Sequence, residues 1–466
     1  MKFKILILAL CVASCQQYDF VEDSGATLMF SRDTLDCDTV FAPFGSTTFS
    51  CKVFNPSNKN LRFDEVRLQL GAASPFRINV DGQDGYSVRN VKLAQKDSLF
   101  IFVEVKENRA LQLTDAVVFV ANGVELRSRL ELLAYGQEVT LLDRDTTLPN
   151  GYTFTADKPY VITGKLEVDT NFVADIEAGA KLYFGNSCGL TVHGRLNVNG
   201  TQTHPCTLSF VRHYDLWYAK AVGQWRGITV SATGSANVSS TWIRGADAAL
   251  DIVDTLGETS HTQLTLSQAL VEYANIGIHS RGGRLLADNC LVADCRDNAV
   301  LAEGGSCELY HCTLAAQQLP KDNDYHGTML VLQNFCQREK AKLSFDTLHI
   351  PLTAYVANSI AYGNNYNELS LHELKQPATP MNITFERCIL KLDNSYDLSS
   401  GDRYLNVSKK NPLLKDVAKR DFHLSEKSPA INAGANAITL IYPLDFDGND
   451  RTALHDTSLG CYAYLP

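Results

Sequence analysis

A short strand pattern that recurs along the second half of the chain constrains its fold most. Six segments share one small-residue position, and aligning Thr241, Ala269, Cys290, Cys312, Ser359 and Cys388 gives steps of 28, 21, 22, 47 and 29 residues. Steps of 21 and 22 match one coil of a right-handed parallel β-helix, and steps of 28 and 29 match a coil with an added loop. The step of 47 fits two coils, or one coil with a long excursion. One coil cannot bury its own apolar face, so neighbouring coils stack about 4.8 Å apart and share a core.

Segments before this series carry the same two-strand pattern. Residues 175–184 and 189–200 each place a turn between two short strands. The chain has 19 Tyr and 21 Phe but only 4 Met and 14 Pro, a composition that favours strands. A TIM barrel would need helices between its strands, and no stretch has the pattern of a long amphipathic helix. We therefore predict an all-β chain with a single-stranded right-handed parallel β-helix over residues 137–466.

Residues 27–136 show a different pattern, with short alternating strands and turn signals every 8 to 12 residues. Residues 47–54 alternate and then turn at Asn55-Pro56-Ser57-Asn58, and residues 97–105 form a nearly continuous apolar strand. This pattern predicts an antiparallel, immunoglobulin-like β-sandwich. No group of residues with catalytic chemistry is concentrated there, so we interpret the sandwich as a spacer.

The N-terminus has the three regions of a secretory signal peptide. Lys2 and Lys4 precede an apolar run over residues 5–12, which is too short to cross a membrane as a helix. Val12-Ala13-Ser14-Cys15 then resembles a bacterial lipobox, in which the Cys thiol receives lipid. We predict a signal peptide over residues 1–14, lipidation at Cys15 and a polar tether over residues 15–26. The membrane, reached through this lipid, is the first predicted partner.

The overall charge excludes one class of partner. The formal net charge is −10, so no basic excess is present to neutralise phosphates, and we expect no nucleic-acid binding. Hydrophobic residues make up 45% and charged residues 20% of the chain, which is enough apolar surface for packed cores.

Several motifs together resemble a family of Bacteroides-type outer-membrane lipoproteins that has no assigned activity. They are residues 38–41, 45–48 and 75–82 in the first domain, residues 177–180, 196–201 and 223–228 in the coils, and residues 428–434, 445–451 and 459–464 near the C-terminus. The family usually has Pro and Ala where this chain has Asp450 and Cys461. The resemblance implies a cell-envelope, outer-membrane lipoprotein with a pectate-lyase-like superfold. It also implies that residues 411–466 close the β-helix. Acidic residues after Cys15 favour exposure at the cell surface.

The chain has 13 cysteines, an odd number, so a complete set of intrachain disulfides is excluded. Cys290, Cys312 and Cys388 share one coil position, and we interpret their thiols as a buried packing ladder. A Cys290–Cys312 bridge between adjacent coils remains an alternative. We predict a disulfide between Cys37 and Cys51 in the sandwich. Because no spacing fits a common metal pattern, we expect neither a metal nor a cofactor.

Two loops are the best candidates for ligand binding. The first, residues 212–218, contains Tyr214, Trp217 and Tyr218 and lies just before Trp225 and Arg226. Aromatic faces stack on sugar rings, and charged side chains bond hydroxyl groups, so this mixture suits a glycan. The second loop contains Asp324 and His326. Aromatic residues that merely cap the flank of the coils, and a solvated second loop, remain the alternatives.

No catalytic residue is assigned from the sequence. Asp251 with Asp254, and Asp294 with Asp297, could form the carboxylate pair of a glycosidase, but we interpret them as solvated corner residues. We interpret Asp445 to Asp450 as a tight turn, because the Gly position does not fit a calcium loop. The leading hypothesis is a non-catalytic lipoprotein that binds a glycan or a surface partner, or has a structural role. The alternative is a polysaccharide lyase or glycoside hydrolase. That alternative predicts that acidic and basic side chains from neighbouring coils converge on one flank.

Overall fold

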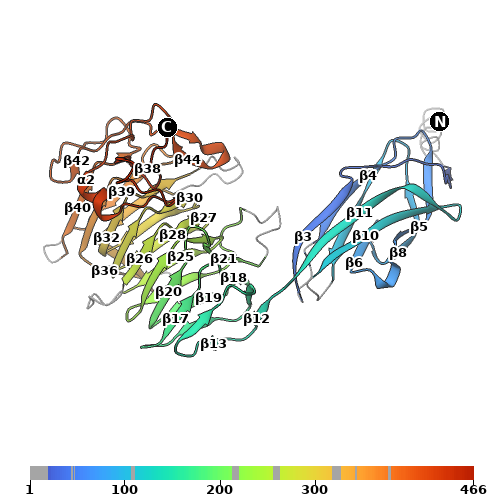
Figure 1. The fold of residues 1–466 in the computed structure, drawn as a ribbon, viewed down its shortest axis with the longest axis horizontal. Coiled ribbons are helices and arrows are strands. Elements are labelled where there is room, and N and C mark those ends of the chain that lie inside the picture. The colour runs from blue at the N-terminus through green and yellow to red at the C-terminus, as the bar shows by residue number, and fades with distance from the viewer. Residues whose placement is uncertain are drawn as a thin grey trace, which may run out of the picture. The chain divides into compact units, whose positions relative to one another are not determined.

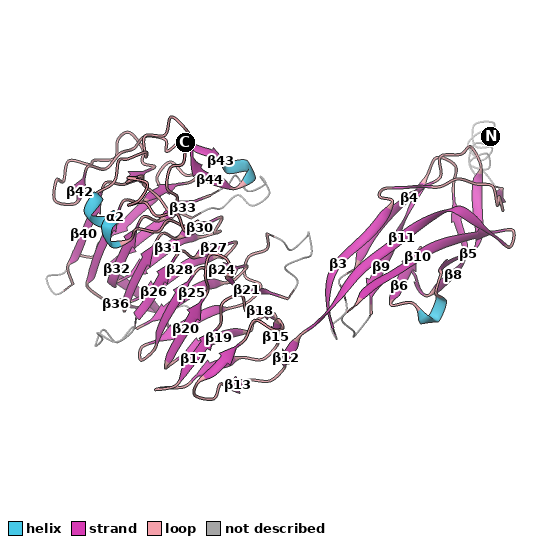
Figure 2. Cartoon of the chain, viewed as in Figure 1, coloured by secondary structure: helices cyan, strands magenta, loops and turns pink. Residues whose placement is uncertain are grey.

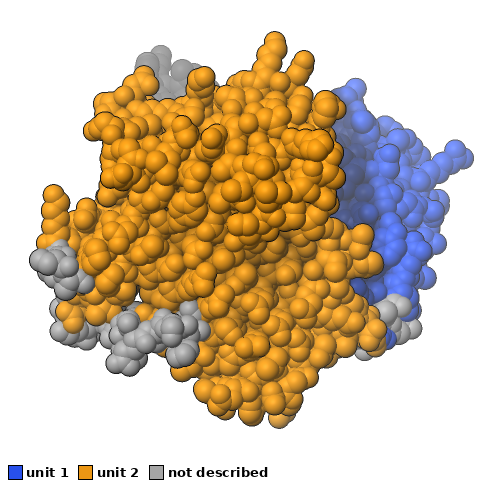
Figure 3. Space-filling model, turned by 60° about the vertical axis from the view of Figure 1, so that its left-hand side comes forward, with its two compact units in different colours: residues 1–139 blue, residues 140–466 orange. Residues whose placement is uncertain are grey.

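The computed structural model describes residues 19–42, 46, 48–106, 111–211, 220–254, 263–316, 327–341, 344–375 and 379–466. Of Ala42, residues 338–341 and residues 344–345 only the backbone is described. The chain divides into two compact units, residues 1–139 and 140–466, which are coloured separately in Figure 3. Strand β11 continues to Glu138, so this division falls three residues after the predicted boundary at residue 136.

The first unit is a two-sheet sandwich with mostly antiparallel pairing. The larger sheet has the order β1-β5-β10-β11-β3, with β8 also paired to β5, and the smaller has the order β2-β4-β9-β6-β7. A 3-10 turn, η1 (Gly71–Ala73), precedes β6. The strands are β1 (Phe20–Val21), β2 (Met29–Phe30), β3 (Thr34–Ala42), β4 (Phe49–Phe54), β5 (Asn60–Leu68), β6 (Phe76–Val80), β7 (Gln83–Gly85), β8 (Ser87–Leu93), β9 (Ser98–Val105), β10 (Gln112–Ala121) and β11 (Val124–Glu138).

Alternation along each strand builds the core of the sandwich. In β6, Phe76, Ile78 and Val80 are buried, while the residues between them face outward, which is the two-residue period of a half-buried strand.

The sandwich also includes part of the predicted tether. Strand β1 pairs with β5 in parallel, and Asp23 Oδ2 lies 2.7 Å from Lys59 Nζ. The last residues of the predicted tether therefore belong to the folded unit.

The predicted Cys37–Cys51 disulfide is not formed, because both residues are buried free thiols. They lie in different sheets, Cys37 in β3 and Cys51 in β4. Each thiol has its own contacts there: Cys37 Sγ lies 3.9 Å from Leu35 O, and Cys51 Sγ lies 3.4 Å from Ser31 Oγ. Burial raises the pKa of Cys37 to about 12, so this thiol is a packing group.

The second unit is a parallel β-helix, which confirms the predicted fold class. Successive strands along the chain join three sheets in turn. From β12 to β34 each strand pairs in parallel with the strand three places along the chain, and the step becomes five where β32, β33 and β34 pair with β37, β38 and β39. We call the sheets A, B and C. Figures 1 and 2 show the resulting ladders of short strands.

Sheet A has ten strands: β12 (Thr140–Leu142), β15 (Tyr160–Ile162), β18 (Lys181–Phe184), β21 (Cys206–Phe210), β24 (Thr241–Arg244), β27 (Leu270–Glu272), β30 (Leu291–Ala293), β33 (Thr313–Ala315), β38 (Ile360–Tyr362) and β41 (Ile389–Leu390). Sheet B has nine: β13 (Thr146–Thr147), β16 (Leu166–Val168), β19 (Gly189–Val192), β22 (Gly227–Ser231), β25 (Ala248–Val253), β28 (Ile276–Arg281), β31 (Asn298–Glu303), β34 (Leu330–Gln333) and β39 (Leu369–His372). Sheet C has ten: β14 (Tyr152–Phe154), β17 (Val173–Ile176), β20 (Arg195–Asn199), β23 (Ser235–Ser239), β26 (Gln263–Ser267), β29 (Arg284–Asp288), β32 (Gly305–Tyr310), β37 (Leu352–Ala357), β40 (Met381–Glu386) and β42 (Tyr404–Leu405).

The predicted alignment of the coils is confirmed residue by residue. The register of sheet A places Trp242, Leu270, Leu291, Thr313, Ile360 and Ile389 side by side, so the six aligned small residues that precede them also stack. Strand β33 pairs directly with β38, so the step of 47 residues is one coil with excursions. One excursion is the antiparallel hairpin of β35 (Phe335–Ala341) and β36 (Ser344–His349).

One sharp corner, between sheets C and A, has the same backbone conformation in coil after coil. Its residues have positive φ angles of 39° to 55°, a left-handed conformation that Asn adopts more readily than most residues. They are Ser240, Gln268, Asn289, His311, Asn358 and Arg387. The next residue in each coil points inward, so small side chains such as Cys290 and Cys388 stack in the core.

The thiols of this stack are free and buried, as predicted, and no disulfide joins Cys290 to Cys312. Burial raises the pKa of Cys388 to about 12, and the pKa of Cys290 is also raised, by burial and by the neighbouring Cys312 thiol. Neutral thiols are poor nucleophiles and poor metal ligands. In the part of the chain that the structure describes, no group of His, Cys, Asp and Glu side chains could hold a metal ion.

The closing segment, residues 411–466, contains β43 (Leu414–Asp416), the 3-10 turn η2 (Val417–Lys419), β44 (Asp421–Leu424) and the helix α2 (Asn436–Ile441). It runs back along the corner between sheets C and A, where the corner side chains donate hydrogen bonds to its backbone carbonyl groups. Arg387 Nη1 donates to Ala433 O at 3.3 Å, Asn358 Nδ2 to Ala435 O at 3.1 Å and Gln268 Nε2 to Asp445 O at 2.6 Å. Asp445 accepts from Asn449 N at 2.7 Å, which confirms the predicted tight turn.

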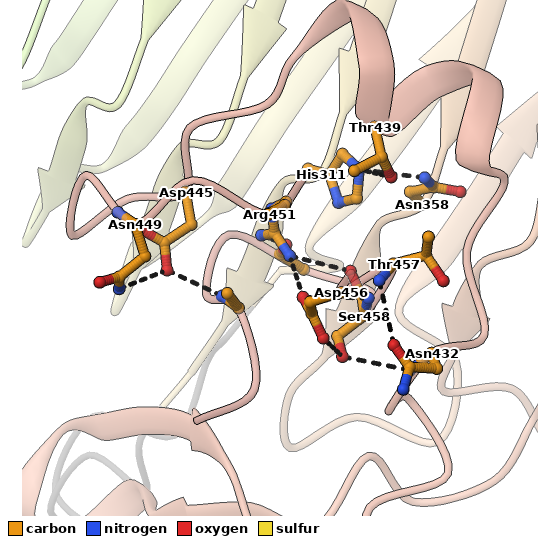
Figure 4. A network of polar contacts seen from close by, with 12 residues as sticks. His311, Asn358, Asn432, Thr439, Asp445, Asn449, Arg451, Asp456, Thr457 and Ser458 are labelled. Atoms are coloured by element: carbon orange, nitrogen blue, oxygen red, sulfur yellow. Dashed lines mark hydrogen bonds and ion pairs between the residues drawn. The ribbon is translucent and has the colours of Figure 1, made fainter. Parts of the chain in front are cut away.

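A buried polar network fixes the closing segment (Figure 4). Arg451 is fully buried, and its guanidinium donates to Asp456 Oδ2 at 3.1 Å, to Ser458 O at 3.2 Å and to Gly460 O at 2.8 Å. Burial lowers the pKa of Arg451, and Asp456 opposes this effect. Because the buried charge is paired and hydrogen-bonded, the network specifies one position for the segment.

Candidate functional site

Most of the predicted ligand-binding residues lie outside the described residues. Tyr214, Trp217 and Tyr218 belong to residues 212–219, and Asp324 and His326 belong to residues 317–326. The predicted lipidation site, Cys15, also lies outside them. Within the described residues, no helix is long and apolar enough to cross a membrane.

Trp225 is not a ligand-binding residue. Its side chain is 1% exposed and stacks on Phe184 of the preceding coil, with ring centroids 4.3 Å apart and planes within 8°. Its indole Nε1 donates to Arg244 O at 2.8 Å. The ring therefore fills the core and satisfies its one donor there. Arg226, the next residue, is exposed, and its backbone N–H donates to Cys188 O at 2.7 Å.

A groove lies on the outer face of sheet A, where the closing segment covers part of that face. Leu291, Ala293 and Ala315 of the sheet pack under Phe422 and Tyr462. Toward the earlier coils the cover ends and a groove of about 510 Å³ opens. The groove is lined by Lys181, Tyr183, Thr207, Ser209, Trp242, Arg244, Leu270, Glu272 and Leu291 of sheet A, and by Arg420, Phe422, Phe446 and Tyr462 of the closing segment.

Trp242 is the aromatic platform of this groove. It occupies an outward position of β24 between Thr207 and Leu270, its register partners on the two neighbouring strands. Its side chain remains 49% exposed, in contrast to that of Trp225. An exposed indole beside hydroxyl and charged side chains is the usual composition of a sugar-binding surface.

A group of charged side chains anchors the closing segment to the floor of the groove. Arg420 contacts Glu272 and the Tyr273 hydroxyl, and its Nη1 lies 3.1 Å from Asp294 Oδ2. Arg244 Nε donates to the same Glu272 at 2.5 Å. The Arg420 guanidinium also stacks over the Tyr273 ring, 4.6 Å from its centroid. Both carboxylates are buried and paired with arginine, so they hold the wall of the groove in place.

Of the four carboxylates that we interpreted as solvated corner residues, three are buried. Asp294 does lie at a corner with positive φ, but its side chain is fully buried against Arg420, and Asp254 is also buried. Asp251 lies in strand β25 of sheet B, and burial raises its pKa. Asp297 alone remains partly exposed. The solvated interpretation was wrong for the other three because corner spacing does not reveal what packs over a corner.

Asp251 belongs to a second group of polar side chains, which spans four coils on the outer face of sheet B. His279 Nδ1 lies 3.6 Å from Asp251 Oδ1, and His279 Nε2 lies 2.9 Å from Glu303 Oε2. Arg281 Nε donates to Asp251 at 3.3 Å, and Gln333 Nε2 donates to Glu303 at 2.8 Å. Acidic and basic side chains from neighbouring coils thus converge on one flank.

Sequence reasoning missed Trp242, Arg420 and the His279 group. A signal for Trp242 was present, because it alternates with the inward residues Thr241 and Ile243 of a predicted strand and so must point outward. Arg420 carried no such signal, since its partner Glu272 lies 148 residues earlier in the sequence.

Comparisons with known proteins identify no family. Neither a protein-family model nor a curated protein matches the chain. Among solved structures, the ASH/PapD-like domain 7 of human CEP192 has 9% sequence identity and a TM-score of 0.18. That match covers 27% of this chain and 95% of the domain. The VesB protease of Vibrio cholerae has 16% identity and a TM-score of 0.17, and the match covers 23% of this chain and 31% of the protease. Similarities this low carry no argument about function.

Proposed function

We propose that this protein is a lipid-anchored cell-envelope protein of the outer-membrane lipoprotein type, and that its β-helix binds a glycan chain without catalysis. The groove on sheet A carries the binding proposal. It combines the exposed Trp242 ring with further aromatic residues and with hydroxyl and charged groups, which together suit the two faces of a sugar ring. Its volume of about 510 Å³ lies within the range of ligand sites.

The anchor and the family rest on the sequence. The lipobox at Cys15 supports attachment to the membrane, and the motif set supports kinship with the Bacteroides-type lipoproteins. The charge of −10 supports the expectation that nucleic acid is not a partner. Cys15→Ala should abolish incorporation of labelled fatty acid and move the chain from the detergent phase to the aqueous phase. Unchanged fatty-acid labelling of this variant would overturn the anchor.

The glycan proposal is tested on an array of bacterial and plant oligosaccharides, followed by calorimetry on the hits. Trp242→Ala should weaken binding at least tenfold, because a stacked aromatic ring contributes a large share of such contacts. Tyr366→Ala is the matched control, since Tyr366 is 87% exposed and does not line the groove. An array without hits, or equal affinity of wild type and Trp242→Ala, rejects the proposal.

The convergence on sheet B favours a second candidate function, that of a glycoside hydrolase or polysaccharide lyase. Asp251 and Glu303 flank His279, and burial raises the pKa of Asp251, as a general acid requires. In a hydrolase, one protonated carboxyl group would donate its proton to the leaving glycosidic oxygen while the other carboxylate accepts a proton from water. Release of reducing sugar by wild type, and its loss in both Asp251→Asn and Glu303→Gln, would establish this function.

A further inference from the structure

Among the described residues, one end of the sheet A groove has a buried hydroxyl group without a hydrogen-bond partner and a lysine without a paired carboxylate. Ser209 is 1% exposed and lines the groove, yet its hydroxyl has no hydrogen-bond partner. Buried polar groups are almost always hydrogen-bonded, so an unpartnered buried hydroxyl requires an explanation. Lys181 lies on the neighbouring strand β18, where Tyr183 pairs with Ser209 and Lys181 pairs with Thr207. The two side chains are therefore diagonal neighbours on one sheet face.

Lys181 is also the uncompensated cation of the groove. The lining contains three cations, Lys181, Arg244 and Arg420, and one anion, Glu272. Asp294 supplies a second carboxylate against Arg420, and Arg244 and Arg420 both contact Glu272. Among the residues that the structure describes, no acidic side chain pairs with Lys181, which is exposed. The groove thus carries one net positive charge, three cations against two carboxylates, in a chain whose net charge is −10.

We propose that the glycan bound in this groove is acidic, and that its carboxylate or sulfate group lies against Lys181 and Ser209 while a sugar ring stacks on Trp242. This inference rests on the proposed glycan binding. A carboxylate and a sulfate ester both present several acceptor oxygens to an ammonium group and a hydroxyl donor. The anion supplies the acceptor that the Ser209 hydroxyl lacks and the negative counter-charge that Lys181 lacks.

The test uses the full mature chain and three sets of size-matched oligosaccharides: neutral, uronic-acid-containing and sulfated. Wild type should bind an acidic set at least tenfold more tightly than the neutral set, with an affinity that falls as salt is raised. Comparison of the uronic-acid and sulfated sets identifies the acid group. Lys181→Gln should lose about tenfold in affinity for the acidic set and leave neutral binding unchanged, as expected for one charge-assisted hydrogen bond. Lys165→Gln, an exposed lysine outside the groove, is the matched control.

Ser209→Ala separates ligand contact from structural support. Because the native hydroxyl has no partner, its removal should leave the midpoint of unfolding unchanged or raise it, yet lower affinity for the acidic set. Equal binding of neutral and acidic sets by wild type, or an unchanged affinity in Lys181→Gln, overturns the acidic assignment alone. In that case Trp242→Ala still reports on glycan binding. If no set binds to wild type, both the assignment and the proposed function are rejected.

Discussion

His311 Nε2 lies 3.0 Å from Thr439 Oγ1, so a buried contact joins a corner of the β-helix to helix α2, 128 residues later in the chain. Asn358 Nδ2 donates to the same ring nitrogen at 3.0 Å. The orientation of the Asn358 amide is fixed, because its Oδ1 accepts from the backbone N–H of Ala435 at 2.7 Å. Nε2 must therefore be an acceptor, and the imidazole is neutral in the folded protein.

The stability of the second unit should consequently fall in mild acid. Burial, assisted by the nearby Arg451 charge, lowers the pKa of His311 well below 6.5. In the unfolded chain this histidine titrates near 6.5. Below about pH 6.5 the unfolded state therefore binds more protons than the folded state, and the free energy of unfolding decreases as the pH falls. Urea unfolding at pH 6.5 and pH 5.0 should show this decrease.

His311→Gln is the matched variant for the pH experiment. Its glutamine cannot titrate, so the difference between pH 6.5 and pH 5.0 should shrink relative to wild type. His423 does not contribute in this window. Hydrogen bonds that its ring donates to Asp447 and Asp421 raise its pKa, so its stabilisation is complete below about pH 6.5 and is lost only as the pH rises through the raised value. Identical pH dependence of wild type and His311→Gln would contradict the assigned protonation state.

Arg451→Met should destabilise the second unit by about 3–5 kcal/mol, because it leaves Asp456 as an unpaired buried carboxylate. It also removes the donors that Ser458 O and Gly460 O now accept from. Urea unfolding measures the loss. Lys419→Met is the control, since Lys419 is largely exposed and a surface change there should stay within about 0.5 kcal/mol. A change below about 1 kcal/mol for Arg451→Met would rule out a stabilising network around this residue.

Truncation of Trp225 and of Trp242 should have very different effects on stability. Trp225→Ala should lower the free energy of unfolding by about 3–5 kcal/mol, because it empties a core position against Phe184. Trp242→Ala should change the free energy of unfolding little, because half of that side chain is already in water. Parallel denaturation curves of both variants, read by far-ultraviolet circular dichroism, compare them directly. Equal losses in the two variants would contradict the assignment of Trp225 to the core and Trp242 to the groove.

The cysteines should be unreactive in the folded protein. All 11 described cysteines are buried free thiols, and burial raises the pKa of Cys295 and of Cys307 to about 12. Iodoacetamide at pH 8 should therefore leave these residues unmodified in the native chain and alkylate them after unfolding in guanidinium chloride. Peptide mass spectrometry reads out each site. A Cys37–Cys51 cross-linked peptide under non-reducing conditions would show that the sandwich is bridged after all.

Local pattern made the coils predictable. The small residues aligned from Thr241 to Cys388 recur because each must fit the same inward position after the same left-handed corner. Such a rule acts within one coil and its neighbours, so spacing along the chain is enough to reveal it. The alternation over residues 47–54, most of which form β4, located the sandwich for the same reason.

The candidate site was much less predictable. Trp225 lies just before strand β22, where no period indicates which way a side chain points, and stacking on Phe184 of another coil decided its place. The interpretation of Asp294 as solvated failed because Arg420, which covers it, arrives from the closing segment. Nothing in the sequence around Asp294 indicates that Arg420 packs over it.

The sequence by itself determined the order of the domains, the length of the coil and the inward stack of small residues, because each follows from repeated local geometry. Only the tertiary structure decided where the closing segment lies on sheet A. That position follows from single contacts such as Arg420 with Glu272 and Asn358 with Ala435, between residues far apart in the chain. The groove exists only between those two surfaces, so its walls, its exposed Trp242 and its uncompensated Lys181 become visible together only once the chain has folded.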